Sequence, residues 1–268
     1  MRRTALAALC LAAVATAGLT GCGSEGKADD SSSHDPSARN TAKEGKNTPE
    51  PAKEPFAGLT AGDIAERAFE ATNGASSLRM TGDVPDDGGG GGSIRIDMAL
   101  NKRGECAGTM GVEGQGEAEL IRTGDTVYLK YDEEFLRSQS EGEPKESVDA
   151  TVALLAGKWT RMSAEGADAE DLAELCDLDQ IFDGAKKGDS GATRGKTTTI
   201  DGTPAITLTA RDGADRYTLY VATEGEPYLL RLDSASTTEP GSLTFSDYDE
   251  PVPVEKPAGD VLDLDALG

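Results

Sequence analysis

Apolar and polar residues alternate along much of this chain, which is the pattern of β-strands that bury one face. The clearest run covers residues 94–100, whose apolar positions are Ile94, Ile96, Met98 and Leu100. Glycine-containing turns such as Asp201-Gly202 separate many of these runs, as in a series of hairpins. The other predicted strands cover 77–84, 106–112, 117–122, 126–131, 158–162, 196–200, 204–210, 216–222, 228–233 and 243–248.

Four segments place their apolar residues at helical spacing instead. The first follows Thr60, puts Ile64 and Ala68 on one face, and stops at Asn73-Gly74. The others cover 133–138, 148–155 and 170–182. No strand–helix–strand alternation requires a parallel sheet, and about ten strands in one antiparallel sheet must curl. We therefore predict an α+β fold, a curved antiparallel half-barrel of about 10–11 strands with helices on its concave face.

The first 21 residues have the pattern of a lipoprotein signal peptide. Arg2 and Arg3 precede an apolar run over 4–19, and Leu19-Thr20-Gly21-Cys22 matches the lipobox Leu-x-Gly-Cys. In this interpretation Cys22 is lipidated, becomes the new N-terminus and anchors the protein to the extracytoplasmic face of the cell membrane. An uncleaved anchor or an ordinary secretory signal is the alternative interpretation.

The remaining chain divides into a tether and one folded domain. Residues 22–55 hold the lipidated Cys and a polar segment with too few large apolar residues to fold. Residues 56–268 are long enough to bury a core of their own. The net charge of −23 repels phosphate backbones, so we expect no nucleic-acid partner.

The four cysteines indicate a disulfide. Cys10 lies in the signal peptide and Cys22 is the lipidation site, which leaves Cys106 and Cys176 in the domain. Two thiols outside the cytoplasm most simply pair with each other. Two buried free thiols are the alternative.

Catalytic chemistry is not indicated. The only histidine, His34, lies in the tether, which excludes Ser-His-Asp, Cys-His and histidine-zinc machinery from the domain. Carboxylate pairs such as Asp177 and Asp179 occur by chance in so acidic a chain, and no Asp-x-Asp-x-Asp-Gly calcium loop is present. We expect no enzyme activity, no cofactor and no metal site.

Four stretches and the order of the elements resemble the LolA-like superfamily, and within it the LppX/LprA/LprF/LprG envelope lipoproteins. The stretches are Thr126-Val127-Tyr128-Leu129-Lys130, Gly157-Lys158-Trp159, Glu226-Pro227-Tyr228-Leu229-Leu230-Arg231 and Phe245-Ser246-Asp247-Tyr248-Asp249-Glu250-Pro251-Val252. The resemblance extends from Phe56 to the C-terminus. It implies a half-barrel whose helices enclose an apolar cavity, and a role in carrying acylated lipids or glycolipids. Other members of the superfamily act as sensors or regulators.

The alternating apolar residues supply a candidate lining for such a cavity. The set is Ile94, Ile96, Met98, Val127, Leu129, Ile206, Leu208, Leu219, Val221, Leu230, Leu232 and Phe245. The same side chains would also serve as a dry core packed against the helices. Two functional interpretations follow: a membrane-anchored module that binds an acyl-chain lipid, or an anchored sensor domain that binds another envelope protein and carries no lipid.

Overall fold

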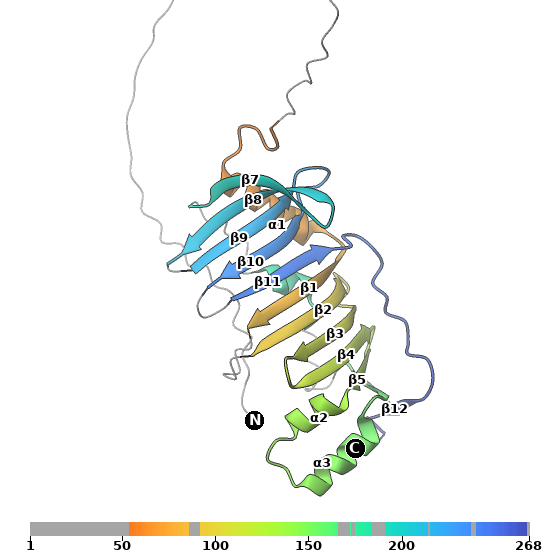
Figure 1. The fold of residues 1–268 in the computed structure, drawn as a ribbon. Coiled ribbons are helices and arrows are strands. Elements are labelled where there is room, and N and C mark those ends of the chain that lie inside the picture. The colour runs from red at the N-terminus through yellow and green to blue at the C-terminus, as the bar shows by residue number, and fades with distance from the viewer. Residues whose placement is uncertain are drawn as a thin grey trace, which may run out of the picture.

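The computed structural model describes residues 54–85, 92–165, 172, 175–183, 191–213, 215–236 and 240–266. Within them, twelve strands form a single sheet in the order β12-β6-β5-β4-β3-β2-β1-β11-β10-β9-β8-β7 (Figure 1). The strands are β1 (Ser77–Pro85), β2 (Ser93–Asn101), β3 (Cys106–Val112), β4 (Gly116–Thr123), β5 (Thr126–Tyr131), β6 (Trp159–Ser163), β7 (Thr193–Ile200), β8 (Thr203–Asp212), β9 (Asp215–Ala222), β10 (Leu229–Ala235), β11 (Pro240–Ser246) and β12 (Val261–Asp263).

This arrangement confirms the predicted α+β fold with its open, curved antiparallel sheet. Neighbouring strands run antiparallel throughout, except that β12 runs parallel to β6. Every predicted strand is present, and β12 is the one that the alternation did not indicate. Two meanders, β1–β6 and β7–β11, meet where β1 pairs with β11, so that Met80 lies opposite Phe245.

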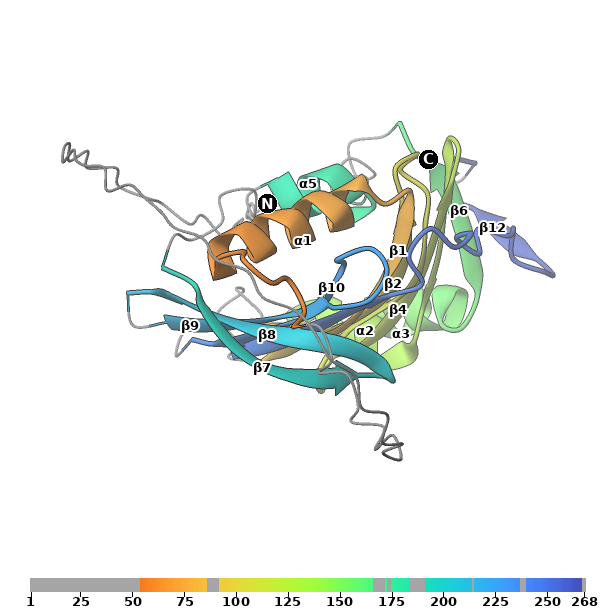
Figure 2. The ribbon, with the colours of Figure 1, turned by 90° about the horizontal axis from the view of Figure 1, so that it is seen from above.

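Helix α1 (Ala61–Gly74) lies across the concave face of the sheet, beside α5 (Leu178–Asp183) (Figure 2). A capping box fixes its start, because the Asp63 N–H donates to the Thr60 hydroxyl and the Asp63 carboxylate accepts from the Thr60 N–H. The predicted helix over 170–182 corresponds to α5 at its C-terminal end, and much of its first part lies outside the described residues.

Helices α2 (Glu133–Gln139) and α3 (Lys145–Leu155) do not lie on the concave face. They connect β5 to β6 and lie beyond one end of the sheet, with α2 against β4 and α3 against α2 (Figure 1). No residue of α3 is buried. The expectation of helices on the concave face therefore holds for α1 and α5, whereas α2 and α3 cap the end of the sheet.

Glycines inside two strands allow neighbouring strands to approach each other closely. A Cβ atom at Gly82 would lie 1.9 Å from the Ser242 carbonyl oxygen, and one at Gly108 would lie 2.0 Å from the Asp97 carbonyl oxygen. Both positions are close approaches between neighbouring backbones, which only glycine allows. Larger residues there would force strands β1 and β11, or β2 and β3, apart.

The C-terminal segment adds β12 as the edge strand beside β6. Asp263 of β12 forms an ion pair with Arg161 of β6, and the Ser163 N–H donates to the Asp265 carboxylate at 2.9 Å. At the opposite edge lies β7, which pairs with β8. No helix among the described residues is long and apolar enough to cross a membrane.

Candidate functional site

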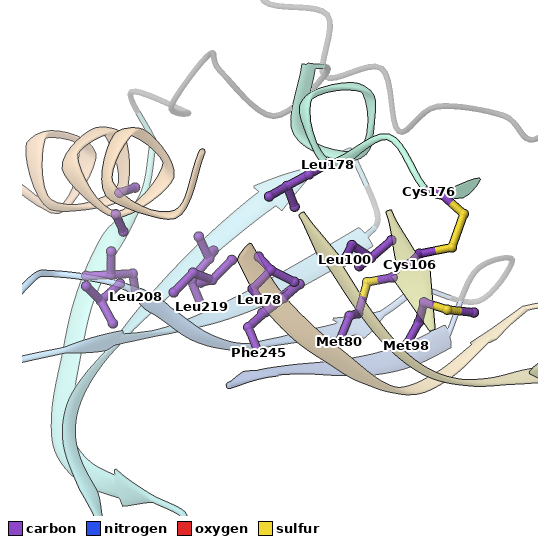
Figure 3. Close-up of a cluster of buried hydrophobic side chains, with 14 of the residues drawn as sticks. Leu78, Met80, Met98, Leu100, Cys106, Cys176, Leu178, Leu208, Leu219 and Phe245 are labelled. Carbon is purple, nitrogen blue, oxygen red and sulfur yellow. A yellow bond between two sulfur atoms is a disulfide. The ribbon is translucent and has the colours of Figure 1, made fainter. Parts of the chain in front are cut away.

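The concave face of the sheet carries a continuous layer of buried apolar side chains. Leu78, Leu100 and Cys106 lie directly opposite one another on β1, β2 and β3, and all three are fully buried. Residues of β4, β5 and β8–β11 extend this layer across the sheet. Figure 3 shows Leu78, Met80, Met98, Leu208, Leu219 and Phe245 of this layer on the sheet, with Leu178 of α5 above them.

Small residues of α1 face this layer. Ala61, Ala65 and Ala68 are buried together with Ile64, and of these four only Ile64 has a large side chain. The larger Phe69 of α1 is partly buried and packs against the same cluster.

Methionine is concentrated on the same face. Met80 and Met98 lie opposite each other on β1 and β2, Met110 lies opposite Ile96, and Met162 lies opposite Val127. All four belong to the concave cluster or pack against it, and they are all the methionines of the chain apart from Met1. Because methionine is unbranched and flexible, a layer rich in it adapts to guests of irregular shape.

A disulfide joins the sheet to the helical layer. Cys106 of β3 is bonded to Cys176, two residues before α5, with their Cα atoms 5.4 Å apart (Figure 3). This is the pairing that the cysteine count predicted. It holds α5 over the concave face of β3.

A buried polar cluster fastens the C-terminal end of α1 to β10. The Leu229 N–H donates to the Thr72 hydroxyl at 2.9 Å, and the Tyr248 hydroxyl donates to the Leu229 carbonyl. Burial raises the pKa of Tyr248 well above its usual value. The ring of Tyr248 stacks on that of Tyr228 with their centroids 3.9 Å apart.

The outer part of this cluster is charged. Asp249 accepts from the Ser76 N–H at 2.7 Å and from the Tyr228 hydroxyl at 2.8 Å. The bond from the Ser76 N–H is the main reason that the pKa of Asp249 is lowered, and the bond to Asp249 raises the pKa of Tyr228 to about 12. These groups tie the start of β1 to the segment that follows β11, next to the end of α1.

Most of the predicted lining lies in the concave layer. Ten of the twelve residues belong to the cluster or pack against it: Ile96, Met98, Val127, Leu129, Ile206, Leu208, Leu219, Val221, Leu232 and Phe245. Eight of these ten are buried, whereas Ile96 and Leu232 are half-buried. Ile94 is half-buried near the start of β2 and lies outside the cluster.

Leu230 is a correction to the sequence interpretation. It packs with Ala205 and Ala222 in a second small cluster on the convex face. A bulge between Leu229 and Arg231 shifts the alternation of β10 by one residue, so that Leu229 is buried on the concave face in place of Leu230. The sequence interpretation missed Leu229 because strict alternation cannot show a bulge.

Two open depressions lie elsewhere on the described surface. One, of about 500 Å³, lies between the β3–β4 turn and α2, and the other, of about 340 Å³, lies between the same turn and the ends of β1 and β2. Acidic and polar residues such as Glu133, Glu134 and Asp83 line them, and none of the predicted apolar lining takes part. No group of three or more potential metal ligands occurs among the described residues. The predicted lipidation site Cys22 lies outside them.

Comparison with known proteins identifies the fold. No family model matches the chain, and no curated protein matches it. Among solved structures, LprF from Mycobacterium bovis is 18% identical, with a TM-score of 0.50 over 74% of this chain and 97% of that one. Lipoprotein LppX of Mycobacterium tuberculosis is 17% identical, with a TM-score of 0.45 over 73% and 98% of the two chains.

A LolA superfamily protein from Nitrosomonas europaea also matches, at 12% identity and a TM-score of 0.23 over 74% of this chain and 96% of that one. Of these three structures, LprF has the highest TM-score. The fold is therefore an open sheet with helices on its concave face, similar to that of LprF. At this level of identity the likeness concerns the fold, and a fold by itself does not determine function.

Proposed function

We propose that this chain is a membrane-anchored envelope lipoprotein that binds an acyl-chain lipid or glycolipid between its concave sheet face and α1 and α5. The observation that carries the proposal is the apolar layer on that face, which extends from β1 across both meanders. Acyl chains are excluded from water for the same reason that these side chains are buried. The lipobox at Cys22 supplies the proposed anchor at the extracytoplasmic face of the cell membrane.

Three features favour a guest over a permanently closed core. The buried face of α1 presents mostly small alanine side chains to the layer, and the four methionines make the layer adaptable. The apolar surface also continues beyond the buried part, since Ile96, Met110 and Leu232 are only half-buried. Accessible apolar surface of this kind is typical of ligand-binding faces.

The competing proposal is an anchored domain that binds another envelope protein. Eight of the predicted lining residues are already buried in the structure, as in a filled core that holds no lipid, and this favours the competing proposal. The two proposals differ in what the concave face contains when the protein is isolated from cells.

Native mass spectrometry of the purified chain tests this difference. We expect a co-purifying mass of one or more acyl-chain lipids, and we expect the delipidated protein to bind a fluorescent fatty-acid probe. Bare protein that fails to bind the probe would contradict the lipid proposal and favour the interaction domain.

Tryptophan substitutions locate the binding face. Leu219→Trp should abolish probe binding by filling the concave face, whereas Thr218→Trp, on the opposite face of the same strand, should not. Because Leu219 is buried, overpacking there also costs stability. Ile96→Trp, at a half-buried position, is therefore the second variant, and circular dichroism verifies that each variant is folded.

A further inference from the structure

Arg122 occupies an unusual place in the apolar layer. It lies directly opposite Cys106 of β3 on one side and Val127 of β5 on the other, and both of these residues are fully buried on the concave face. Residues directly opposite in antiparallel strands project from the same face of a sheet. Arg122 is therefore the one charged residue in the row Leu78, Leu100, Cys106, Arg122, Val127 and Met162.

The guanidinium of Arg122 is incompletely paired. Its Nη1 donates to the Gly104 carbonyl at 2.7 Å, whereas its Nε is buried and has no hydrogen-bond partner among the residues that the structure describes. No carboxylate of the described residues lies within 4.0 Å of it, although the chain contains 49 acidic residues. A buried donor on a charged group is costly when it is left unpaired, so this one requires an explanation.

Arg194 provides an internal comparison. It lies on the same face of the other meander, opposite Leu208. Its guanidinium donates to the carbonyls of Pro55 and Phe56 and lies 3.9 Å from the Glu54 carboxylate. Among the described residues, the fold thus supplies carbonyl and carboxylate partners to Arg194 and one carbonyl partner to Arg122.

We infer that Arg122 binds the anionic headgroup of the acyl-chain ligand, with the chain lying along the concave layer. The inference rests on the proposed function. With Nη1 held by Gly104, the Nε–Nη2 edge of the guanidinium remains, and this edge pairs with two oxygens of a carboxylate or a phosphate. The neighbouring side chains of Val127, Leu120 and Met162 are apolar and suit the first part of the chain.

One competing partner lies within the chain itself. Asp168, Glu170, Asp171 and Glu174 precede Cys176 in the sequence and lie outside the described residues. Cys176 is bonded to Cys106, the neighbour of Arg122. The experiment must therefore separate a ligand headgroup from one of these carboxylates.

Matched probes measure the headgroup preference of the delipidated protein. Oleate and oleyl alcohol share one chain and differ in charge, and dioleoylphosphatidic acid and dioleoylglycerol are the corresponding phosphate pair. We expect the wild type to bind at least one charged probe about tenfold more tightly than its uncharged partner, as one charge-assisted hydrogen bond allows. The pair that shows the difference tells whether the headgroup is a carboxylate or a phosphate.

Variants of Arg122 connect this preference to the residue. Arg122→Gln should remove the preference and leave the affinity for the uncharged probe unchanged, and Arg122→Lys should retain most of it. Arg211→Gln is the control, because Arg211 is exposed on the convex face and should behave as wild type.

Three outcomes would overturn the inference. Equal affinity of the wild type for charged and uncharged probes does so while leaving the proposed function intact. The second outcome is that Arg122→Gln and a variant that neutralises Glu174, Asp168, Glu170 or Asp171 are strongly non-additive in the free energy of unfolding, while the headgroup preference is unchanged. That carboxylate would then be the partner of Arg122, and the proposed function would stay intact. Failure to bind any of the four probes defeats the proposed function, and the inference with it.

Discussion

Replacing Thr72 by Val should loosen the attachment of α1 to the sheet. Thr72 and Leu229 are both 0% exposed, and the Thr72 hydroxyl is the acceptor for the Leu229 N–H at 2.9 Å. Valine keeps the volume and the branching of threonine but leaves this N–H without its acceptor. A buried donor left unpaired costs about 1–3 kcal/mol, so we expect the free energy of unfolding to fall by about 2 kcal/mol. For a domain of this size that is a fall in Tm of about 4–8 °C.

Urea denaturation followed by circular dichroism measures this loss. Thr199→Val, at an exposed position on β7, is the matched control and should change stability by less than about 0.5 kcal/mol. Tyr248→Phe removes the donor to the Leu229 carbonyl, and its effect combined with Thr72→Val should be less than additive, because both act on one cluster. A loss below about 0.5 kcal/mol for Thr72→Val would refute the reasoning, since the Leu229 N–H would then have found another partner.

Three other predictions concern the anchor, the disulfide and the pH dependence of stability. Cys22→Ala should release the protein from the membrane fraction or leave it unprocessed, and a membrane-bound, processed variant would contradict the lipidation. Replacing Cys106 and Cys176 together by Ala should lower the free energy of unfolding by about 4 kcal/mol, given the separation of 70 residues, and urea denaturation showing almost no loss would be incompatible with this. Because the pKa of Asp249 is lowered on folding, its stabilisation is present above about pH 4 and is lost as the pH falls through the lowered pKa. Asp249→Asn should therefore lose less stability than wild type when urea denaturation is repeated between about pH 5 and pH 2, and an equal loss would count against this role.

The alternation of apolar and polar residues determined most of the local structure. It located eleven of the twelve strands found in the described part of the chain, and the capping residues of α1 marked where that helix begins. The disulfide followed from counting, because only Cys106 and Cys176 remained in the predicted domain. These features depend on neighbours in the sequence or on composition, which is why the sequence suffices for them.

Tertiary structure decided which residues share the concave face. The pairing of β1 with β11 brings together residues such as Met80 and Phe245, which are far apart in the chain, and no local pattern specifies such a contact. The bulge in β10 reversed the expected positions of Leu229 and Leu230. Helices α2 and α3 have apolar positions, as α1 does, yet their place between β5 and β6 keeps them at the end of the sheet.

Arg122 is the clearest case of a residue whose position the sequence alone did not determine. In the predicted strand over 117–122 the alternation puts Arg122 on the same face as Leu120, but it does not tell whether that face is concave or convex. An arginine at a strand end would ordinarily be assigned to solvent. Only the pairing with Cys106 and Val127 places it within the apolar layer, because the face of a strand is fixed by its partners rather than by its own residues.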